Sequence, residues 1–159
     1  MKKILVIIFL ILSTSVLSAN ERDTKLDKLF LELKKNIPSL SPGIAEQIWK
    51  LWSTHPTDQK LTSLLDEGSM LVQDQQLNKA IVVFTEAIEL DPNWAEAWNK
   101  RATVLYMIGE FQKSQDDIDK VLELEERHFG ALAGQGMVNI QLKNYDKAKR
   151  SYQKAQEIY

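Results

Sequence analysis

The chain contains no cysteine among its 159 residues, and this absence excludes several classes of protein. Disulfide scaffolds, thiolate zinc sites and cysteine nucleophiles all need the thiol, as does the lipid anchor of an exported lipoprotein. Glycine and proline are also scarce, at 6 and 4 residues, which is few for a turn-rich β-sandwich and suits helices joined by short turns. The net charge of −2 provides no broad basic field for binding nucleic acid.

The first nineteen residues differ in composition from the rest of the chain. Two lysines follow the initial Met, Ile4–Leu12 is an unbroken apolar run, and small residues lead to Ala19. This order is typical of a secretory signal peptide, and the run is shorter than the roughly 20 residues that span a bilayer. We therefore expect cleavage after Ala19 and a periplasmic or secreted protein. The alternative is an uncleaved inner-membrane anchor, in which the apolar residues just before Ala19 lengthen the run.

A period of 34 residues runs through the second half of the chain. Six columns of residues agree in size across three copies, alternating between small and large side chains. The columns are Gly68, Ala102 and Gly136; Leu77, Phe111 and Tyr145; Ala80, Ser114 and Ala148; Phe84, Ile118 and Tyr152; Ala87, Val121 and Ala155; and Leu90, Leu124 and Ile158. Such a period indicates a repeat architecture.

Each copy carries two apolar stripes at helical spacing, which predicts a pair of antiparallel helices. A small residue opposite a large one lets the two helices approach closely. Asp91–Asn93 breaks the chain between the first two copies, and Asn93 is expected to cap the next helix. Gly109 is expected to end the first helix of the second copy, and Asn144 to make the turn of the third. Because one pair cannot bury both of its faces, the copies must stack.

These residues resemble the tetratricopeptide repeat family. On the second helix the family pattern has Ala, Phe, Ala and Pro, and the first copy matches it in full. The matching residues are Ala80, Phe84, Ala87 and Pro92. Trp98 supplies the first-helix aromatic in the second copy. Where the family has a leucine, the three copies have Glu67, Arg101 and Gln135, and we expect these side chains to be half exposed.

The resemblance implies an all-α fold, a right-handed superhelical solenoid of antiparallel helix pairs. The expected divisions of the chain are a signal peptide at 1–19, two capping helices within 20–60, and repeats at 61–94, 95–128 and 129–159. In the capping segment, two amphipathic stripes flank a proline-rich turn, and Ser41 is expected to cap the second helix. We expect this helix pair to cover the open first face of the solenoid.

Neither histidine predicts catalytic chemistry. His128 with Glu125 and Glu126 lacks a nucleophile or a third ligand, so we interpret it as part of a solvated turn. His55 lies beside a proline in another turn. We therefore expect no enzyme activity, no cofactor and no metal.

Three further clusters have structural explanations. Gly130, Gly134 and Gly136 lack the preceding strand of a phosphate-binding loop and are interpreted as close-packing or groove positions. The aspartates of residues 116–119 are interpreted as a solvated helix face. A basic cluster on the last copy is interpreted as ordinary surface charge. Its members are Lys143, Lys147, Lys149, Arg150 and Lys154.

In the tetratricopeptide repeat family, the first helices of successive repeats line a concave groove that holds peptides. The corresponding residues here are Leu65, Ser69, Val72, Asn99, Thr103, Tyr106, Ala133, Met137 and Ile140. Family members that clamp a terminal carboxylate carry Lys, Asn and Arg at five positions. These positions here hold Leu65, Ser69, Lys100, Gly130 and Gly134, so a carboxylate clamp is not expected. A partner that supplies apolar side chains fits better.

The resemblance implies a non-catalytic scaffold or adaptor that binds a protein or peptide partner. The predicted signal peptide places it in the cell envelope, and the charge balance predicts no binding of nucleic acid. The alternative is a membrane-tethered structural subunit whose signal segment is its only membrane contact. Solenoids usually finish with a polar capping helix, and none follows Ile158. We expect Tyr152, Ala155 and Ile158 to be incompletely covered, so that a partner or a second copy docks on the C-terminal end.

Overall fold

The computed structural model describes residues 21–159, and the predicted signal peptide lies outside this range. Within these residues the chain forms eight helices and no strand, which confirms the predicted all-α fold. The chain divides into two compact units, of which the first ends at Gln59 and the second begins at Lys60. No helix between residues 21 and 159 is long and apolar enough to cross a membrane.

The first unit consists of a helix over residues 21–33 and α2 (Ser41–Ser53), packed through their apolar stripes. Arg22 fastens the two helices, because its guanidinium donates to the backbone carbonyl of Leu51 at 3.2 and 3.1 Å. The prediction that Ser41 caps α2 is wrong. Ser41 is the first helical residue, and its hydroxyl donates backward to the carbonyl of Ile37 at 2.9 Å. The buried residues are Leu26, Leu29, Leu33, Ile44, Ala45, Ile48 and Trp52.

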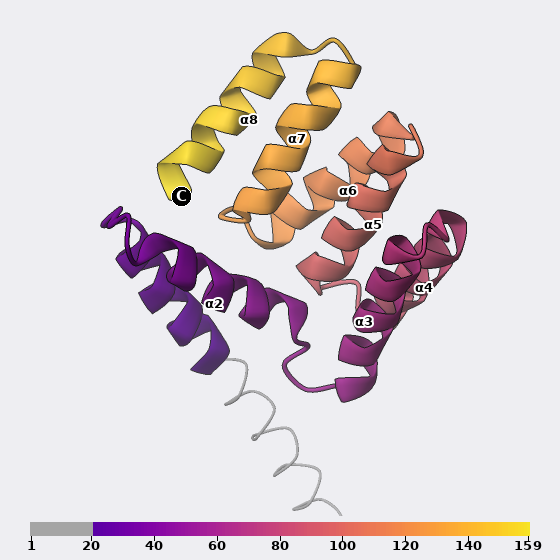
Figure 1. Ribbon diagram of the computed structural model, residues 1–159, viewed down its shortest axis with the longest axis horizontal. Coiled ribbons are helices and arrows are strands. Elements are labelled where there is room, and N and C mark those ends of the chain that lie inside the picture. The colour runs from indigo at the N-terminus through magenta and orange to yellow at the C-terminus, as the bar shows by residue number, and fades with distance from the viewer. Residues whose placement is uncertain (1–20) are drawn as a thin grey trace, which may run out of the picture. The chain divides into compact units, whose positions relative to one another are not determined.

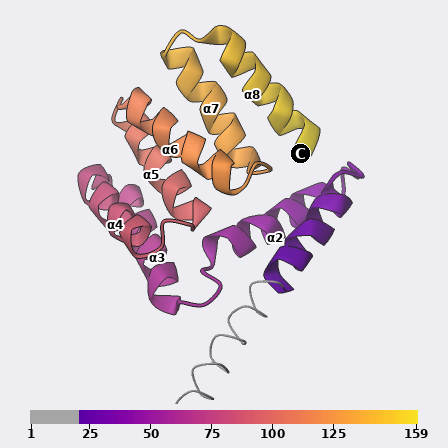
Figure 2. The ribbon, with the colours of Figure 1, turned by 180° about the vertical axis from the view of Figure 1, so that it is seen from behind.

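The second unit contains three helix pairs, which follow one another along the chain (Figures 1 and 2). The helices are α3 (Gln59–Gln73), α4 (Leu77–Leu90), α5 (Ala95–Met107), α6 (Phe111–Leu124), α7 (Phe129–Gln141) and α8 (Tyr145–Ile158). From α4 onward each helix packs against the next, and α5 also contacts α7 directly. The first helices of the second and third repeats are therefore neighbours in space.

The small and large columns of the sequence meet as predicted. A Cβ on Gly68 of α3 would overlap the ring of Phe84 on α4. A Cβ on Gly136 of α7 would lie 2.6 Å from Cζ of Tyr152 on α8. In both pairs the ring occupies the space that the missing methyl group leaves free. The middle repeat combines a methyl group with a branched aliphatic side chain, and its pair is Ala102 and Ile118.

The turns within the three pairs share one backbone geometry. Gln75, Gly109 and Lys143 are spaced by 34 residues, and their φ angles are 58°, 83° and 61°. The prediction that Gly109 ends a helix is confirmed, because α5 stops at Met107 and its C-cap is the next residue. The prediction for Asn144 is wrong. The left-handed residue of that turn is Lys143, and Asn144 precedes α8 as its N-cap residue.

The junction between the first two repeats is organised by Asp91. Its Oδ1 accepts from the backbone N–H of Asn93 at 2.9 Å, which closes a short side-chain turn. The N-cap residue of α5 is Trp94, and it makes no side-chain cap. The prediction that Asn93 caps α5 is therefore wrong, since the aspartate two residues earlier makes the turn and the helix starts one residue later.

Candidate functional site

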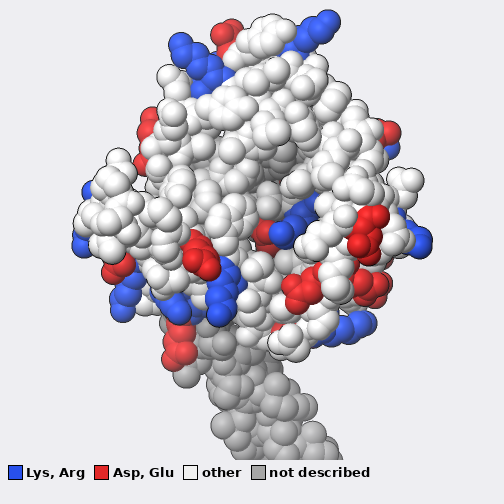
Figure 3. Space-filling view, in the orientation of Figure 1, with Lys and Arg blue, Asp and Glu red and all other residues white. Residues whose placement is uncertain are grey.

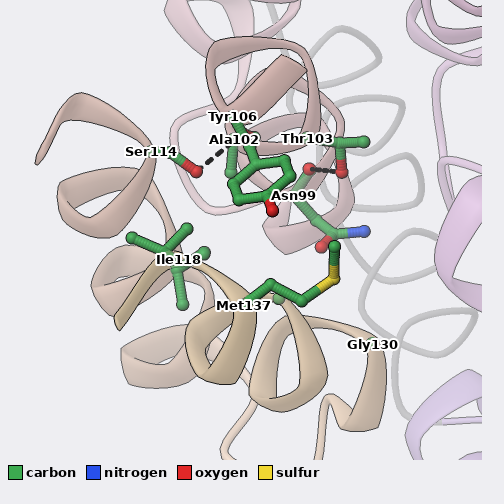
Figure 4. A pocket seen from close by; sticks show the side chains of 10 residues that line it. Asn99, Ala102, Thr103, Tyr106, Ser114, Ile118, Gly130 and Met137 are labelled. Atoms are coloured by element: carbon green, nitrogen blue, oxygen red, sulfur yellow. Dashed lines mark hydrogen bonds between the residues drawn. The ribbon is translucent and has the colours of Figure 1, made fainter. Parts of the chain in front are cut away.

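A pocket of about 80 Å³ lies among α5, α6 and α7 of the second unit (Figure 4). Helix α5 contributes Asn99, Ala102, Thr103 and Tyr106, α6 contributes Ser114 and Ile118, and α7 contributes Gly130, Gly134, Met137 and Val138. None of these residues carries a charge. The pocket is therefore a small, mainly apolar hollow beside the first helices of the second and third repeats.

The structure brings together four of the nine residues predicted to line the groove. These four are Asn99, Thr103, Tyr106 and Met137. Four others lie outside the pocket and are partly or fully exposed, and they are Ser69, Val72, Ala133 and Ile140. Leu65 is only 1% exposed and belongs to the core formed by α3, α4 and α5. The prediction that Leu65 lines the groove is wrong, because its side chain is buried in this core.

Two side chains give the pocket its apolar character. In Figure 4 the ring of Tyr106 and the thioether of Met137 point into the space between α5 and α7. The Tyr106 ring is held by Phe111, whose ring centroid lies 5.5 Å away. Met137 keeps 44% of its surface exposed, so the pocket can be reached from solvent.

Three polar side chains of the pocket wall donate hydrogen bonds within the protein. The hydroxyl of Thr103 donates to the carbonyl of Asn99 at 2.9 Å. The hydroxyl of Ser114 donates to the carbonyl of Ala102 at 2.7 Å, and the Asn99 amide donates to Glu96 at 3.1 Å. These bonds fix three side chains of the wall, and because most of the remaining lining is apolar, we expect shape and apolar contact to be the main means of recognition.

A buried histidine supports this wall. His128 is fully buried, with Nε2 lying 3.0 Å from Oε2 of Glu96 on α5. Its Nδ1 accepts from the backbone N–H of Ala131 at 3.1 Å, at the start of α7. Because Nδ1 is an acceptor, the proton lies on Nε2 and is donated to the carboxylate. The prediction of a solvated turn is wrong for His128, since Glu96 of the same repeat gives the ring a buried partner.

His55 makes the same kind of contact ahead of α3. Its Nδ1 accepts from the backbone N–H of Asp58 at 2.9 Å, and the side chain is buried. Both histidines thus satisfy backbone donors at helix starts, where such donors have no partner within the helix. Among residues 21–159, no group of three His, Asp or Glu side chains is placed to hold a metal ion.

Six polar residues of α4 to α8 bond to one another across the helices, and we call them the polar ladder: Thr85, Arg101, Asp117, Asp119, Gln135 and Ser151. Arg101 of α5 binds both carboxylate oxygens of Asp117 on α6 at 2.8 Å and the hydroxyl of Thr85 on α4 at 3.1 Å. Its guanidinium also lies 5.0 Å from the centre of the Trp98 ring. Asp117 is 5% exposed, so the prediction of a solvated face is wrong for this aspartate.

One repeat later the same positions form the second half of the polar ladder. Gln135 of α7 donates to Asp119 on α6 at 3.0 Å and accepts from Ser151 on α8 at 2.8 Å. Gln135 is buried, so the prediction that it is half exposed is wrong. In both halves, the outer residues lie 16 positions before and after the central one. Polar residues spaced by 16 and repeated after 34 are the signal that sequence reasoning missed.

Charged side chains avoid the pocket. Helix α7 contains no charged residue, and the face over α5, α6 and α7 is mainly uncharged (Figure 3). Lys100, the neighbour of Asn99, lies 3.6 Å from the buried carboxylate of Glu96. In the basic cluster, Lys147 pairs with Asp119 at 3.7 Å. The pocket is therefore lined by neutral side chains alone.

Comparisons with known proteins match this repeat pattern. A family model described as TPR repeat matches residues 68–109, and one described as tetratricopeptide repeat matches residues 130–159. A TPR repeat-containing protein of Rhizobium etli is 32% identical over 136 residues, which cover 85% of this chain and 66% of that protein. Hsp70-Hsp90 organizing protein 3 of Arabidopsis thaliana is 27% identical over 88 residues, which cover 55% of this chain and 16% of that protein. The chain thus spans about two thirds of the first relative and under a fifth of the second.

Solved structures share the helical arrangement. The second TPR of Spaghetti (RPAP3), bound to an HSP90 peptide, has a TM-score of 0.62 at 21% identity and covers 64% of this chain and 94% of its own. The crystal structure of MamA has a TM-score of 0.59 at 19% identity, and the match covers 91% of this chain and 82% of MamA. These likenesses concern the fold, and they confirm the predicted superhelical stack of helix pairs.

Proposed function

The chain belongs to the tetratricopeptide repeat family, and we propose that it binds a segment of a partner polypeptide in the groove beside α5 and α7. The observation that carries this proposal is the pocket, because four residues predicted from the repeat frame meet there around an uncharged, accessible hollow. A related fold with a bound HSP90 peptide supports a peptide as the class of ligand. This likeness does not indicate that the HSP90 peptide itself is the ligand of this chain.

The same proposal describes the protein as a binding module without catalysis or cofactor. The two histidines support it, because each uses its Nδ1 to satisfy a backbone donor at a helix start. The buried carboxylates are also engaged. Glu96 accepts from His128 and Asn99, and Asp117 accepts from Arg101. These histidine and carboxylate side chains therefore stabilise the fold, and they are not free to transfer protons to a substrate.

We further propose that the protein is exported and acts as an adaptor in the cell envelope. The support is the order of the first nineteen residues, with lysines, an apolar run and small residues before Ala19. The alternative is a subunit that remains tethered to the inner membrane by this uncleaved segment. Neither version changes the proposed groove, since α5 and α7 lie far along the chain from Ala19.

Selection of random displayed peptides tests the groove even when the partner has not been identified. The bait is the exported protein, and the blocked variant is Met137→Glu, which puts a carboxylate at the mouth of the pocket. We expect the wild-type protein to enrich related peptides and the variant to enrich none of them. Met107→Glu is the matched control, because Met107 is 45% exposed against 44% for Met137 and lies outside the pocket.

Thermal melts of both variants accompany the selection, since each methionine is partly exposed and its replacement should leave the fold intact. If the wild-type protein enriches no peptide, or if Met137→Glu selects the same peptides as Met107→Glu, the groove is not the binding site.

A further inference from the structure

Two helical glycines hold the pocket open without being required by the backbone. Gly130 and Gly134 both have negative φ, because Gly109 is the only glycine with a positive φ among residues 21–159. A glycine inside a helix costs about 0.5–1 kcal/mol relative to alanine. The other repeats carry larger side chains at the positions of Gly134, and these residues are Asp66 and Lys100. The fold itself therefore accepts a side chain at this position.

Packing does not require Gly134 either. Its missing Cβ would lie 3.6 Å from Cδ1 of Ile118, which is ordinary van der Waals contact. The contrast is with Gly136 in the same helix, where a Cβ would collide with the ring of Tyr152. What a side chain at residue 134 would fill is the pocket, since Gly134 and Ile118 both line it.

The pocket walls favour an uncharged occupant. All ten lining residues are neutral, and the wall hydroxyls of Thr103 and Ser114 already donate to backbone carbonyls. A charged side chain placed here would lose water without gaining a counter-ion, at a cost of several kcal/mol. An aliphatic side chain instead gains about 25 cal/mol for each Å² that it buries.

The volume of the pocket limits the size of the side chain that it can receive. The pocket has about 80 Å³, roughly half of the ~150 Å³ cavity that holds a benzene ring. We propose that it receives one aliphatic side chain of valine, leucine or methionine size from an uncharged stretch of the partner polypeptide. This inference rests on the proposed function, and it specifies which chemistry the groove selects.

The test uses synthetic copies of the peptides enriched by the wild-type protein, with binding measured by calorimetry. Replacing the shared aliphatic residue of a peptide by Ala should weaken binding roughly tenfold or more. Gly134→Leu, which fills the pocket, should weaken binding of the parent peptide by a similar factor. The same substitution should weaken binding of the Ala peptide only slightly further. The matched control is Gly43→Leu in α2, where a Cβ meets nothing within 4 Å.

The outcomes separate the two proposals. Peptides that share an aromatic residue, an acidic residue or a free terminal carboxylate would overturn the aliphatic pocket while leaving peptide binding in place. Equal losses from Gly134→Leu for the parent and Ala peptides would also overturn it. Failure to enrich any peptide would remove the proposed function, and this inference with it. Melts of Gly134→Leu exclude a folding defect, and the smaller Gly134→Ala serves as the second variant if the leucine destabilises the protein.

Discussion

Gly68 and Phe84 form one packing unit across α3 and α4, because the ring occupies the place of the missing methyl group. Phe84 is 1% exposed, so Phe84→Ala should lower the free energy of unfolding by about 3–5 kcal/mol. Gly68→Ala should cost about 1–3 kcal/mol, since its methyl group collides with the ring. In the Phe84→Ala background the same methyl group enters free space and should raise stability. Denaturant melts of the four proteins give the coupling, and strictly additive effects would contradict this contact.

The left-handed turn residues offer a second measurement at the residue scale. Gln75 and Lys143 have positive φ, where a side chain costs about 1–2 kcal/mol that glycine avoids. We expect Gln75→Gly and Lys143→Gly each to raise the free energy of unfolding by about 0.5–1 kcal/mol, after the entropy lost by the added glycine. Gly109→Ala, at the equivalent position, should lower it by about 1 kcal/mol. Destabilisation by both glycine substitutions would show that these turns do not have this geometry in solution.

Single residues also mark where sequence reasoning stopped. The 34-residue period predicted which small residue meets which large one, because size is visible in the sequence. It did not predict the burial of His128, because a histidine near glutamates looks like a solvated turn until Glu96 of α5 is placed against it. The sequence also did not distinguish the role of Gly134 from that of Gly136, since only the packing shows that Gly136 faces the ring of Tyr152.

At the scale of helices, the polar ladder ties α5 and α7 to the second helices on both sides of each. Arg101 neutralises the charge of Asp117, whose carboxylate has little contact with water. Arg101→Leu restores the residue type of the family pattern, yet it should cost about 3–5 kcal/mol because it leaves a buried charge unpaired. Asp117→Ser, which copies Ser151 of the next repeat, should recover most of this loss when added to Arg101→Leu.

Gln135→Leu provides the control for that pair. Asp119 keeps its contacts with Gln115 and Lys147, and Ser151 keeps the carbonyl of Lys147. The loss should therefore be smaller than that of Arg101→Leu. Chemical denaturation followed by the helix signal measures the stability of all three variants. Equal losses for the two leucine substitutions would show that the unpaired charge of Asp117 is not the cause of the larger expected cost.

The spacing of apolar residues predicted the helices well, whereas the residue types at helix ends predicted the caps and turns less well. The apolar stripes placed all six helices of the second unit, because burial of one face dictates where leucine and alanine fall. The predicted caps at Ser41 and Asn93 were wrong for different reasons. The Ser41 hydroxyl donates backward to the carbonyl of Ile37, and the Asp91 carboxylate accepts from the backbone N–H of Asn93. Four of nine groove residues meet in the pocket, whereas Leu65 faces the core, and helical period alone cannot separate two adjacent faces of one helix.

At the scale of the whole molecule, the predicted signal peptide gives a direct mass measurement. Cleavage after Ala19 should leave a product that starts at Asn20, because small residues before the cut are what a signal peptidase accepts. Intact-mass spectrometry of protein recovered from the exported fraction reads this start. A product that retains the first nineteen residues would establish the tethered alternative.

Self-association through the C-terminal end also stays a prediction. In the structure the Tyr152 ring lies over Gly136, and Tyr159 stacks on Phe129 with ring centroids 5.3 Å apart. Tyr159 nonetheless keeps 54% of its surface exposed. Light scattering over a concentration series should show a rising mean mass, and Tyr159→Ser should reduce the rise. A constant monomer mass at every concentration would end this prediction.

The polar ladder also decides which part of this chain could be copied in tandem. A duplication of residues 95–128 would set Asp119 of one copy opposite Arg101 of the next, a carboxylate against a guanidinium. Thr85 would still meet an arginine and Gln135 an aspartate, so both old junctions would survive. A duplication of residues 61–94 would instead set Thr85 opposite Glu67, with no ion pair. Of these two repeats, only the middle one has charge-complementary ends, so a tandem copy of it would add an ion pair at the new junction.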